Sequence, residues 1–133
     1  MAKKNMTTFT GSQKGLSIVK DRCYAYSGLY AANTTAVEVL NFHSGKEILV
    51  IRLYVNGTVE SGSGSGEITT CSISLNGDEV SRLKVETGAE QMPTTVFNDM
   101  VIPPLTNVTV TLDMSGTNSG RKASVVIVGR VYA

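Results

Sequence analysis

Residues 68–86 read ITTCSISLNGDEVSRLKVE, and this stretch decides the fold class of the chain. Apolar residues alternate with polar ones on both sides of the central Asn76-Gly77, and a period of two is typical of half-buried β-strands. Asn and Gly tolerate the positive φ angles that a two-residue hairpin turn requires. The stretch therefore predicts an antiparallel hairpin. The residues expected on its buried side are Cys71, Ile73, Leu75, Leu83 and Val85.

Similar patterns recur on both sides of this hairpin, separated by Gly, Asn, Ser and Pro. The further strands predicted are residues 35–42, 46–55, 100–102, 107–114 and 123–132. Residues 16–19 and 22–26 have a weaker strand pattern, and a short helix over 27–32 is an alternative there. The run 48–51 lacks alternation, which predicts that it is covered on both faces. The segment 87–95 is polar and is predicted to be a loop.

Seven to nine short strands at regular spacing predict an all-β protein, an antiparallel β-sandwich of jelly-roll-like type. An immunoglobulin-like topology is disfavoured because the chain has no Trp to pack on a central disulfide. The 133 residues suit one domain over 1–133, with residues 1–12 as an extended N-terminal arm. The Gly/Ser stretch at 60–66 is predicted to be a loop within that domain.

The composition favours protein partners over nucleic acid or membranes. Charged residues make up 17% of the chain and the net charge is +1, which disfavours a strongly basic nucleic-acid binder. No apolar stretch approaches the ~20 residues of a membrane helix. Residues 1–8 carry positive charge with no apolar segment behind them, so no signal peptide is expected. We therefore expect that the protein is made in the cytoplasm, that it stays there or leaves inside an assembly, and that it does not associate with a membrane.

No pattern of catalytic or metal-binding residues is found. The single histidine, His43, lies in a predicted turn, and none of the many Ser residues lies in the G-x-S-x-G setting of a nucleophile. Cys23 and Cys71 stand too far apart for a zinc motif, and we expect free thiols, with a disulfide as the alternative. The sequence predicts no enzyme, no cofactor and no metal.

A possible base-stacking pattern occurs at residues 20–26, KDRCYAY. Tyr24 and Tyr26 beside Arg22 offer aromatic and basic groups for single-stranded nucleic acid. Tyrosines two positions apart are also ordinary on one face of a strand. Nucleic acid stays disfavoured, and no residue is assigned to it.

Three segments carry a resemblance to known proteins: SLNGDEV at 74–80, DMVIPPLT at 99–106 and VVIVGRVY at 125–132. Over residues 35–133 the chain resembles small β-sandwich structural proteins of tailed phages, namely head-decoration or cement proteins and related coat subunits. The resemblance implies a virion protein that works by self-association, with a trimer favoured. Its implied partners are copies of itself and the major capsid protein or other virion subunits.

The N-terminal arm is the predicted partner interface, because a loose terminal segment can become ordered on a neighbouring subunit. The residues expected there are Lys3, Lys4, Asn5, Met6, Thr7 and Thr8. The alternative function is a lectin-like or receptor-binding module. That alternative requires four tyrosines to cluster: Tyr24, Tyr26, Tyr30 and Tyr54.

Overall fold

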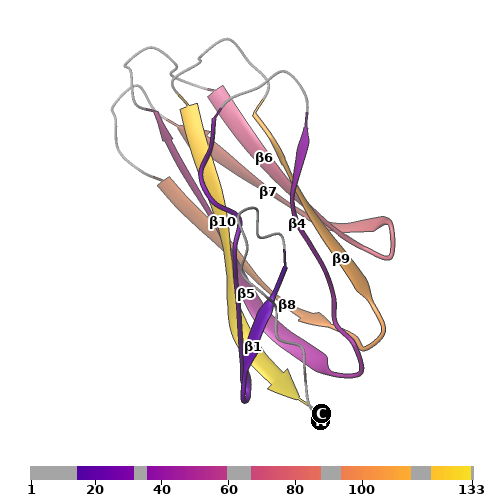
Figure 1. Cartoon of the computed structure of the whole chain (residues 1–133). Coiled ribbons are helices and arrows are strands. Elements are labelled where there is room, and N and C mark those ends of the chain that lie inside the picture. The colour runs from indigo at the N-terminus through magenta and orange to yellow at the C-terminus, as the bar shows by residue number, and fades with distance from the viewer. Residues whose placement is uncertain (1–14, 32–35, 60–66, 88–93, 115–120, 133) are drawn as a thin grey trace.

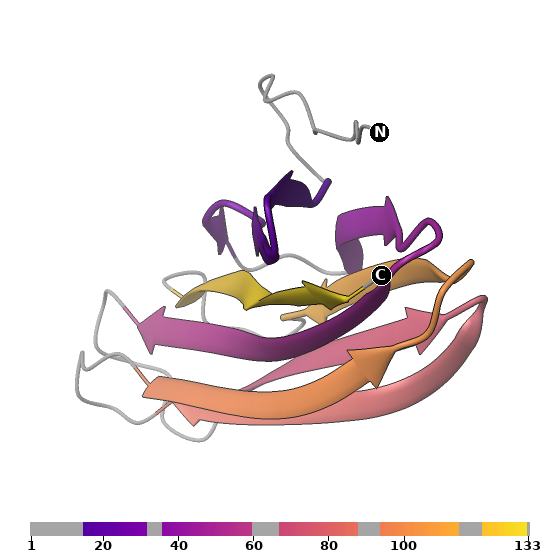
Figure 2. The same cartoon turned by 90° about the horizontal axis from the view of Figure 1, so that it is seen from below.

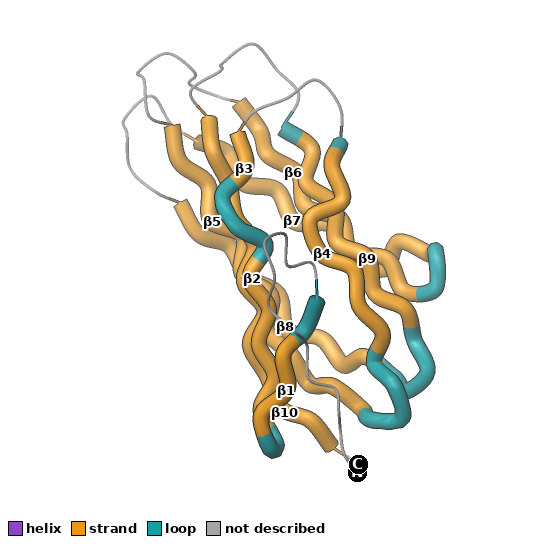
Figure 3. The backbone as a smooth tube through the Cα atoms, in the orientation of Figure 1, coloured by secondary structure: helices purple, strands orange, loops and turns teal. Residues whose placement is uncertain are grey.

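The computed structural model describes residues 15–31, 36–59, 67–87, 94–114 and 121–132, and these residues form ten strands (Figure 1). The strands are β1 (Ser17–Val19), β2 (Arg22–Tyr26), β3 (Tyr30–Ala31), β4 (Val37–His43), β5 (Ile48–Val59), β6 (Glu67–Leu75), β7 (Asp78–Thr87), β8 (Thr94–Ile102), β9 (Asn107–Asp113) and β10 (Arg121–Tyr132). Every described element in Figure 3 is a strand, a loop or a turn. Among these residues, no helix is long and apolar enough to cross a membrane.

The strands form two antiparallel sheets that pack face to face. The larger sheet has the order β1-β2-β10-β5-β8, and β3 pairs with β10 beside β2. The smaller sheet has the order β4-β9-β6-β7. The predicted all-β antiparallel sandwich is therefore confirmed.

The antiparallel pairs are nested along the chain. β2 pairs with β10, β4 with β9, β5 with β8, and β6 with β7. The N-terminal strands consequently lie beside β10, although the two segments come from opposite ends of the chain (Figure 2). Such long-range pairing means that the larger sheet forms only when both ends of the described chain meet.

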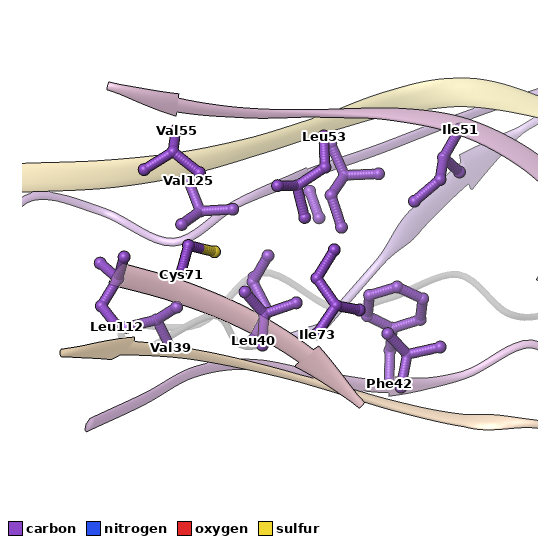
Figure 4. Packing of buried hydrophobic residues seen from close by; sticks show 14 of the residues in the cluster. Val39, Leu40, Phe42, Ile51, Leu53, Val55, Cys71, Ile73, Leu112 and Val125 are labelled. Carbon is purple, nitrogen blue, oxygen red and sulfur yellow. The ribbon is translucent and has the colours of Figure 1, made fainter. Parts of the chain in front are cut away.

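Alternating apolar residues from both sheets build one hydrophobic core (Figure 4). The larger sheet contributes Ile51, Leu53, Val55 and Val125, which point towards side chains of the smaller sheet such as Leu40 and Ile73. Fully burying an aliphatic side chain of this kind contributes about 1.5–3 kcal/mol, so this core dominates the stability of the sandwich. The strand β4 adds two consecutive buried residues, Val39 and Leu40, because its pairing with β9 shifts register there.

The hairpin predicted from residues 68–86 is confirmed. β6 and β7 pair antiparallel, and Asn76 and Gly77 both have positive φ angles, 52° and 90°. Cys71, Ile73 and Val85 are buried, while Leu75 and Leu83 are partly buried against the core. Local turn chemistry and alternation sufficed here because the two strands are neighbours in the sequence.

Three local predictions are wrong. The run 48–51 is not covered on both faces, since Leu49 and Ile51 are buried whereas Ile48 and Val50 are exposed. β8 begins at Thr94 and not at residue 100, so the predicted polar loop ends earlier. The alternative of a helix over 27–32 is also wrong for its described residues, because Tyr30–Ala31 form β3.

The hydrogen bonds of Ser27 explain why the chain stays extended there. The Ser27 amide donates to the Val125 carbonyl, and the Val125 amide donates to Ser27 Oγ at 2.8 Å. The hydroxyl thus replaces a backbone partner between β2 and β3. Gly28, with φ of 86°, then redirects the chain towards β3.

The connection between β8 and β9 is held tightly against the turn that follows β4. The buried Ser44 Oγ donates to the Pro103 carbonyl at 2.8 Å and accepts the Thr106 amide at 3.0 Å. The Leu105 amide donates to the Gly45 carbonyl at 2.6 Å. Leu105 itself has φ of 58°, and its side chain is 67% exposed. A leucine in this region is rare, because its Cβ crowds the backbone.

Candidate functional site

The middle of the outward side of the larger sheet is apolar and arginine-rich. Because residues that pair across strands point to the same side of a sheet, the registers of β2, β10, β5 and β8 align outward side chains in rows, and three of these rows span all four strands. We call these three rows the outer face. The first row is Tyr26, Val126, Tyr54 and Phe97; the second is Tyr24, Val128, Arg52 and Asp99; the third is Arg22, Arg130, Val50 and Val101.

Large apolar groups on the outer face are accessible to solvent. Phe97 is 53% exposed, Tyr24 48% and Tyr26 45%, while Val101 reaches 58%. Val19 extends the third row onto β1, where it pairs with Arg22 and is also exposed. Single exposed apolar residues are normal on a protein surface, but a contiguous patch of them marks an interaction site.

Arg52 and Asp99 form an ion pair within the outer face. Arg52 Nε lies 2.6 Å from Asp99 Oδ1, and Arg52 Nη2 lies 3.0 Å from Asp99 Oδ2. The Arg52 guanidinium also lies over the Phe97 ring, 4.3 Å from its centroid, and the Tyr54 ring lies 5.9 Å from that of Phe97. The hydrogen bonds with Asp99 and Tyr54 raise the pKa of Arg52, so the cation is permanent.

The other two arginines on the outer face differ in their surroundings. Arg130 Nη1 lies 3.4 Å from Asp21 Oδ2. Arg22 pairs directly with Arg130 across the strands, and among the described residues it has no ion-pair partner. Arginine is enriched in the cores of protein interfaces, whereas Lys and Glu are depleted. The three rows contain neither Lys nor Glu.

The outward side of the smaller sheet has a different composition. Its paired rows run Glu38, Thr111, Ser72 and Arg82, then Asn41, Thr109, Ser74 and Glu79. Small hydroxyl side chains occupy the middle of these rows, and the charged groups lie at the edges. These two rows suit contact with water, and the exposed Ile68 and Val80 lie outside them. The rows therefore differ from those of the outer face, which carry large apolar side chains.

The residues considered for catalysis are not assembled into a site by the fold. His43 ends β4 at the surface, and its Nδ1 accepts the Gly45 amide at 2.9 Å, which stabilises the turn. Cys23 and Cys71 are free and buried, and burial raises their pKa values to about 11 and about 12. Both cysteines therefore stay as neutral thiols at physiological pH. Within the described ranges, no group of three or more His, Cys, Asp or Glu could hold a metal ion.

The fold brings three of the four singled-out tyrosines together. Tyr24, Tyr26 and Tyr54 share the outer face, whereas Tyr30 packs against the core from β3.

The predicted interface residues 3–8 lie outside the described residues. Sequence reasoning missed Phe97, Arg52 and the valines of the outer face. The sequence nevertheless contains a signal for this apolar surface. Residues 48–51 and 125–128 are apolar at every position, so these strands place apolar side chains on the outward side as well as on the buried side.

No protein family model and no curated protein matches this chain. Among solved structures, the fold is similar to part of the crystal structure of dimeric latent PorU from Porphyromonas gingivalis, with a TM-score of 0.49 and 10% sequence identity. The match covers 96% of this chain and spans 14% of that chain. Because the overlap is this loose, the functional argument rests on the residues of this chain itself.

Proposed function

We propose that this protein is a structural subunit of a phage-like virion, either a coat subunit or a decoration (cement) protein, that acts through protein–protein assembly. The observation that carries the proposal is the outer face of the larger sheet, with its exposed Tyr, Phe, Val and Arg side chains. Such a composition is typical of the core of a protein interface.

The topology supports the proposal by analogy. We infer that the nested pairs β2·β10, β4·β9, β5·β8 and β6·β7 form a jelly roll, a folded ribbon wound into two facing sheets. Jelly rolls occur in viral capsid proteins and in lectin domains, among others. Because one fold serves many functions, this argument is weaker than the argument from the outer face.

The proposal includes the partners and the place of action. The partners are other copies of this chain, with a trimer favoured, and the major capsid protein or other virion subunits. The place of action is the virion, after synthesis in the host cytoplasm. A near-neutral chain suits this task, since a net charge of +1 causes little repulsion among many copies.

The alternative is a lectin-like or receptor-binding module, and one observation favours it. Tyr24, Tyr26 and Tyr54 lie on the same face, beside the arginines Arg22 and Arg52. Aromatic rings with polar neighbours are a recurring feature of binding sites for small ligands. The five valines on and beside the outer face instead favour a protein partner.

Native mass spectrometry over a wide concentration range, combined with a glycan-binding screen, tests the proposal. A discrete homo-oligomer or a closed assembly that binds no glycan is the expected result. A strict monomer that binds a glycan, and loses this binding when Tyr54 is changed to Ala, would replace the virion proposal by the alternative. Negative-stain electron microscopy of the assembled fraction then shows whether the subunits form a shell or a lattice.

A further inference from the structure

We infer that the outer face binds the same face of a second copy of this chain, so that two sandwiches stack about a two-fold axis. This inference rests on the proposed function, because both require that the protein self-associates. It adds the surface, the partner and the symmetry of the contact.

The area of the outer face fits one side of a stable interface. A Tyr or Phe side chain buries about 150–250 Å² when enclosed, so each half-exposed ring offers roughly 100 Å². With Tyr24, Tyr26, Phe97, the valines and the arginine stems, the outer face offers on the order of 700 Å². A standard interface takes about 800 Å² from each partner, whereas the largest apolar patch of a typical monomer is about 300–600 Å².

The arrangement of the rows is self-complementary. We place the two-fold axis perpendicular to the strands and along the second row. The first row of one copy then lies opposite the third row of the other copy. Arg22 of one copy then faces Tyr26 of the second, a favourable contact of a cation with an aromatic ring. Val101 similarly faces Phe97, and Val50 faces Tyr54. Isologous contacts of this kind use one patch twice and produce closed dimers.

The charges on the outer face are compatible with this stacking. Arg130 faces Val126 when the rows are exchanged, so it does not meet another arginine. Along the axis Arg52 lies opposite Arg52 and Asp99 opposite Asp99 of the second copy, and the ion pair within each copy leaves each Arg52–Asp99 unit neutral as a whole.

The valines favour a protein partner over single-stranded nucleic acid. Nucleic-acid-binding sheets combine stacking aromatic rings with a basic groove that follows the phosphates. Here Val50 and Val128 lie between arginines, Val101 ends the third row, and Asp99 neutralises Arg52. The outer side of the smaller sheet is too rich in Ser and Thr to be the apolar partner. A second copy of the outer face therefore supplies the matching surface.

Sedimentation equilibrium and native mass spectrometry on matched Lys variants test the inference. Tyr24→Lys places a charge near the two-fold axis and is expected to weaken self-association at least about tenfold, as loss of a central aromatic anchor does. Thr111→Lys places the same charge in the middle of the smaller sheet's outer side and is expected to leave association unchanged. Phe97→Ser removes apolar area without adding a charge. It therefore shows whether lost packing alone, without charge repulsion, weakens self-association. Circular dichroism and thermal unfolding confirm that each variant is folded.

Cross-linking tests the assignment of the contact face independently. Val128 lies at the axis in this arrangement, and stacked sheets lie about 10 Å apart. Val128→Cys should therefore give a covalent dimer with a short bismaleimide, whereas Ser72→Cys on the opposite side should not. The native Cys23 and Cys71 are buried and contribute little background. If the protein also has a three-fold contact, its assemblies should contain an even number of subunits, because the two-fold contact joins copies in pairs.

Two outcomes would overturn the inference, and only one of them would also contradict the proposed function. If the protein self-associates but neither Tyr24→Lys nor Phe97→Ser weakens this association, the face is wrongly assigned and the proposed function stands. If the native chain stays monomeric at millimolar concentration, both the stacking and the self-association in the proposed function are contradicted. Tyr24-dependent binding of an oligonucleotide by such a monomer would identify the outer face as a nucleic-acid platform.

Discussion

Arg52 and Asp99 sit directly opposite each other on β5 and β8, joined by two hydrogen bonds of 2.6 Å and 3.0 Å. This pair orders the middle of the outer face, because it also fixes the guanidinium over Phe97. A bidentate pair restricts both side chains more than a single contact does. Asp99 and Thr95 of β8 thus both have partners on β5, which keeps this surface in one arrangement.

The ion pair makes stability depend on pH in a defined direction. Hydrogen bonding to Arg52 lowers the pKa of Asp99 below its ordinary 3.8 in the folded state. Folding therefore gains stability from the pair above about pH 4, and loses it as the pH falls through the lower, folded-state pKa. The gain is small because both side chains are largely exposed. Urea unfolding of the native chain and of Asp99→Asn should differ at pH 6 and converge towards pH 2. A difference that grows on acidification would contradict this origin.

Gly129 is expected to be intolerant of any side chain. A Cβ there would collide with the Val50 carbonyl oxygen and would lie 2.8 Å from Ile51 Cα. Gly129→Ala should lower the free energy of unfolding by at least about 2 kcal/mol, as overpacking against a rigid backbone does. Arg130→Ala, at the adjacent exposed position, is the control and should change stability little. Chemical denaturation of both variants measures the contrast, and equal effects would show that the space at Gly129 is not limiting.

Leu105 is expected to gain stability on replacement by glycine. Its φ of 58° strains a leucine but not a glycine, and its exposed side chain gives up little burial. Leu105→Gly should raise the free energy of unfolding by roughly 0.5–1 kcal/mol. Leu29 is similarly exposed without a positive φ, so Leu29→Gly should lower stability. Thermal unfolding of the two variants should shift in opposite directions, and a shared decrease would refute the strain at Leu105.

The two cysteines are expected to be unreactive in the folded protein. Burial raises the pKa of Cys23 to about 11 and that of Cys71 to about 12, so the reactive thiolate is scarce at pH 8. Labelling with a thiol reagent at pH 8 should be slow in the native state, with Cys71 the slower of the two. Both should react at once in denaturant. Rapid labelling of the folded chain would show that these strands open readily.

Residues that are neighbours in the sequence were predicted well. The hairpin of β6 and β7 and the alternation of β9, with Val108, Val110 and Leu112 inside, follow from local pattern and turn chemistry. β8 was predicted too short because Thr95, Asn98 and Asp99 look like loop residues. Each of them has a partner on another strand: Thr95 donates to Asn56, Asn98 donates to Ser81, and Asp99 pairs with Arg52.

The sequence by itself determined that the chain is an antiparallel β-sandwich, because alternation and Asn-Gly turn chemistry act over a few residues. It also indicated that Cys71 lies on the buried side of an alternating strand. Only the tertiary structure decided that Tyr26, Tyr54 and Phe97 stand in one row. Alternation tells which side of a strand a residue occupies, but the order of strands depends on contacts between residues far apart in the chain. The apolar outer face therefore exists only in the assembled sheet.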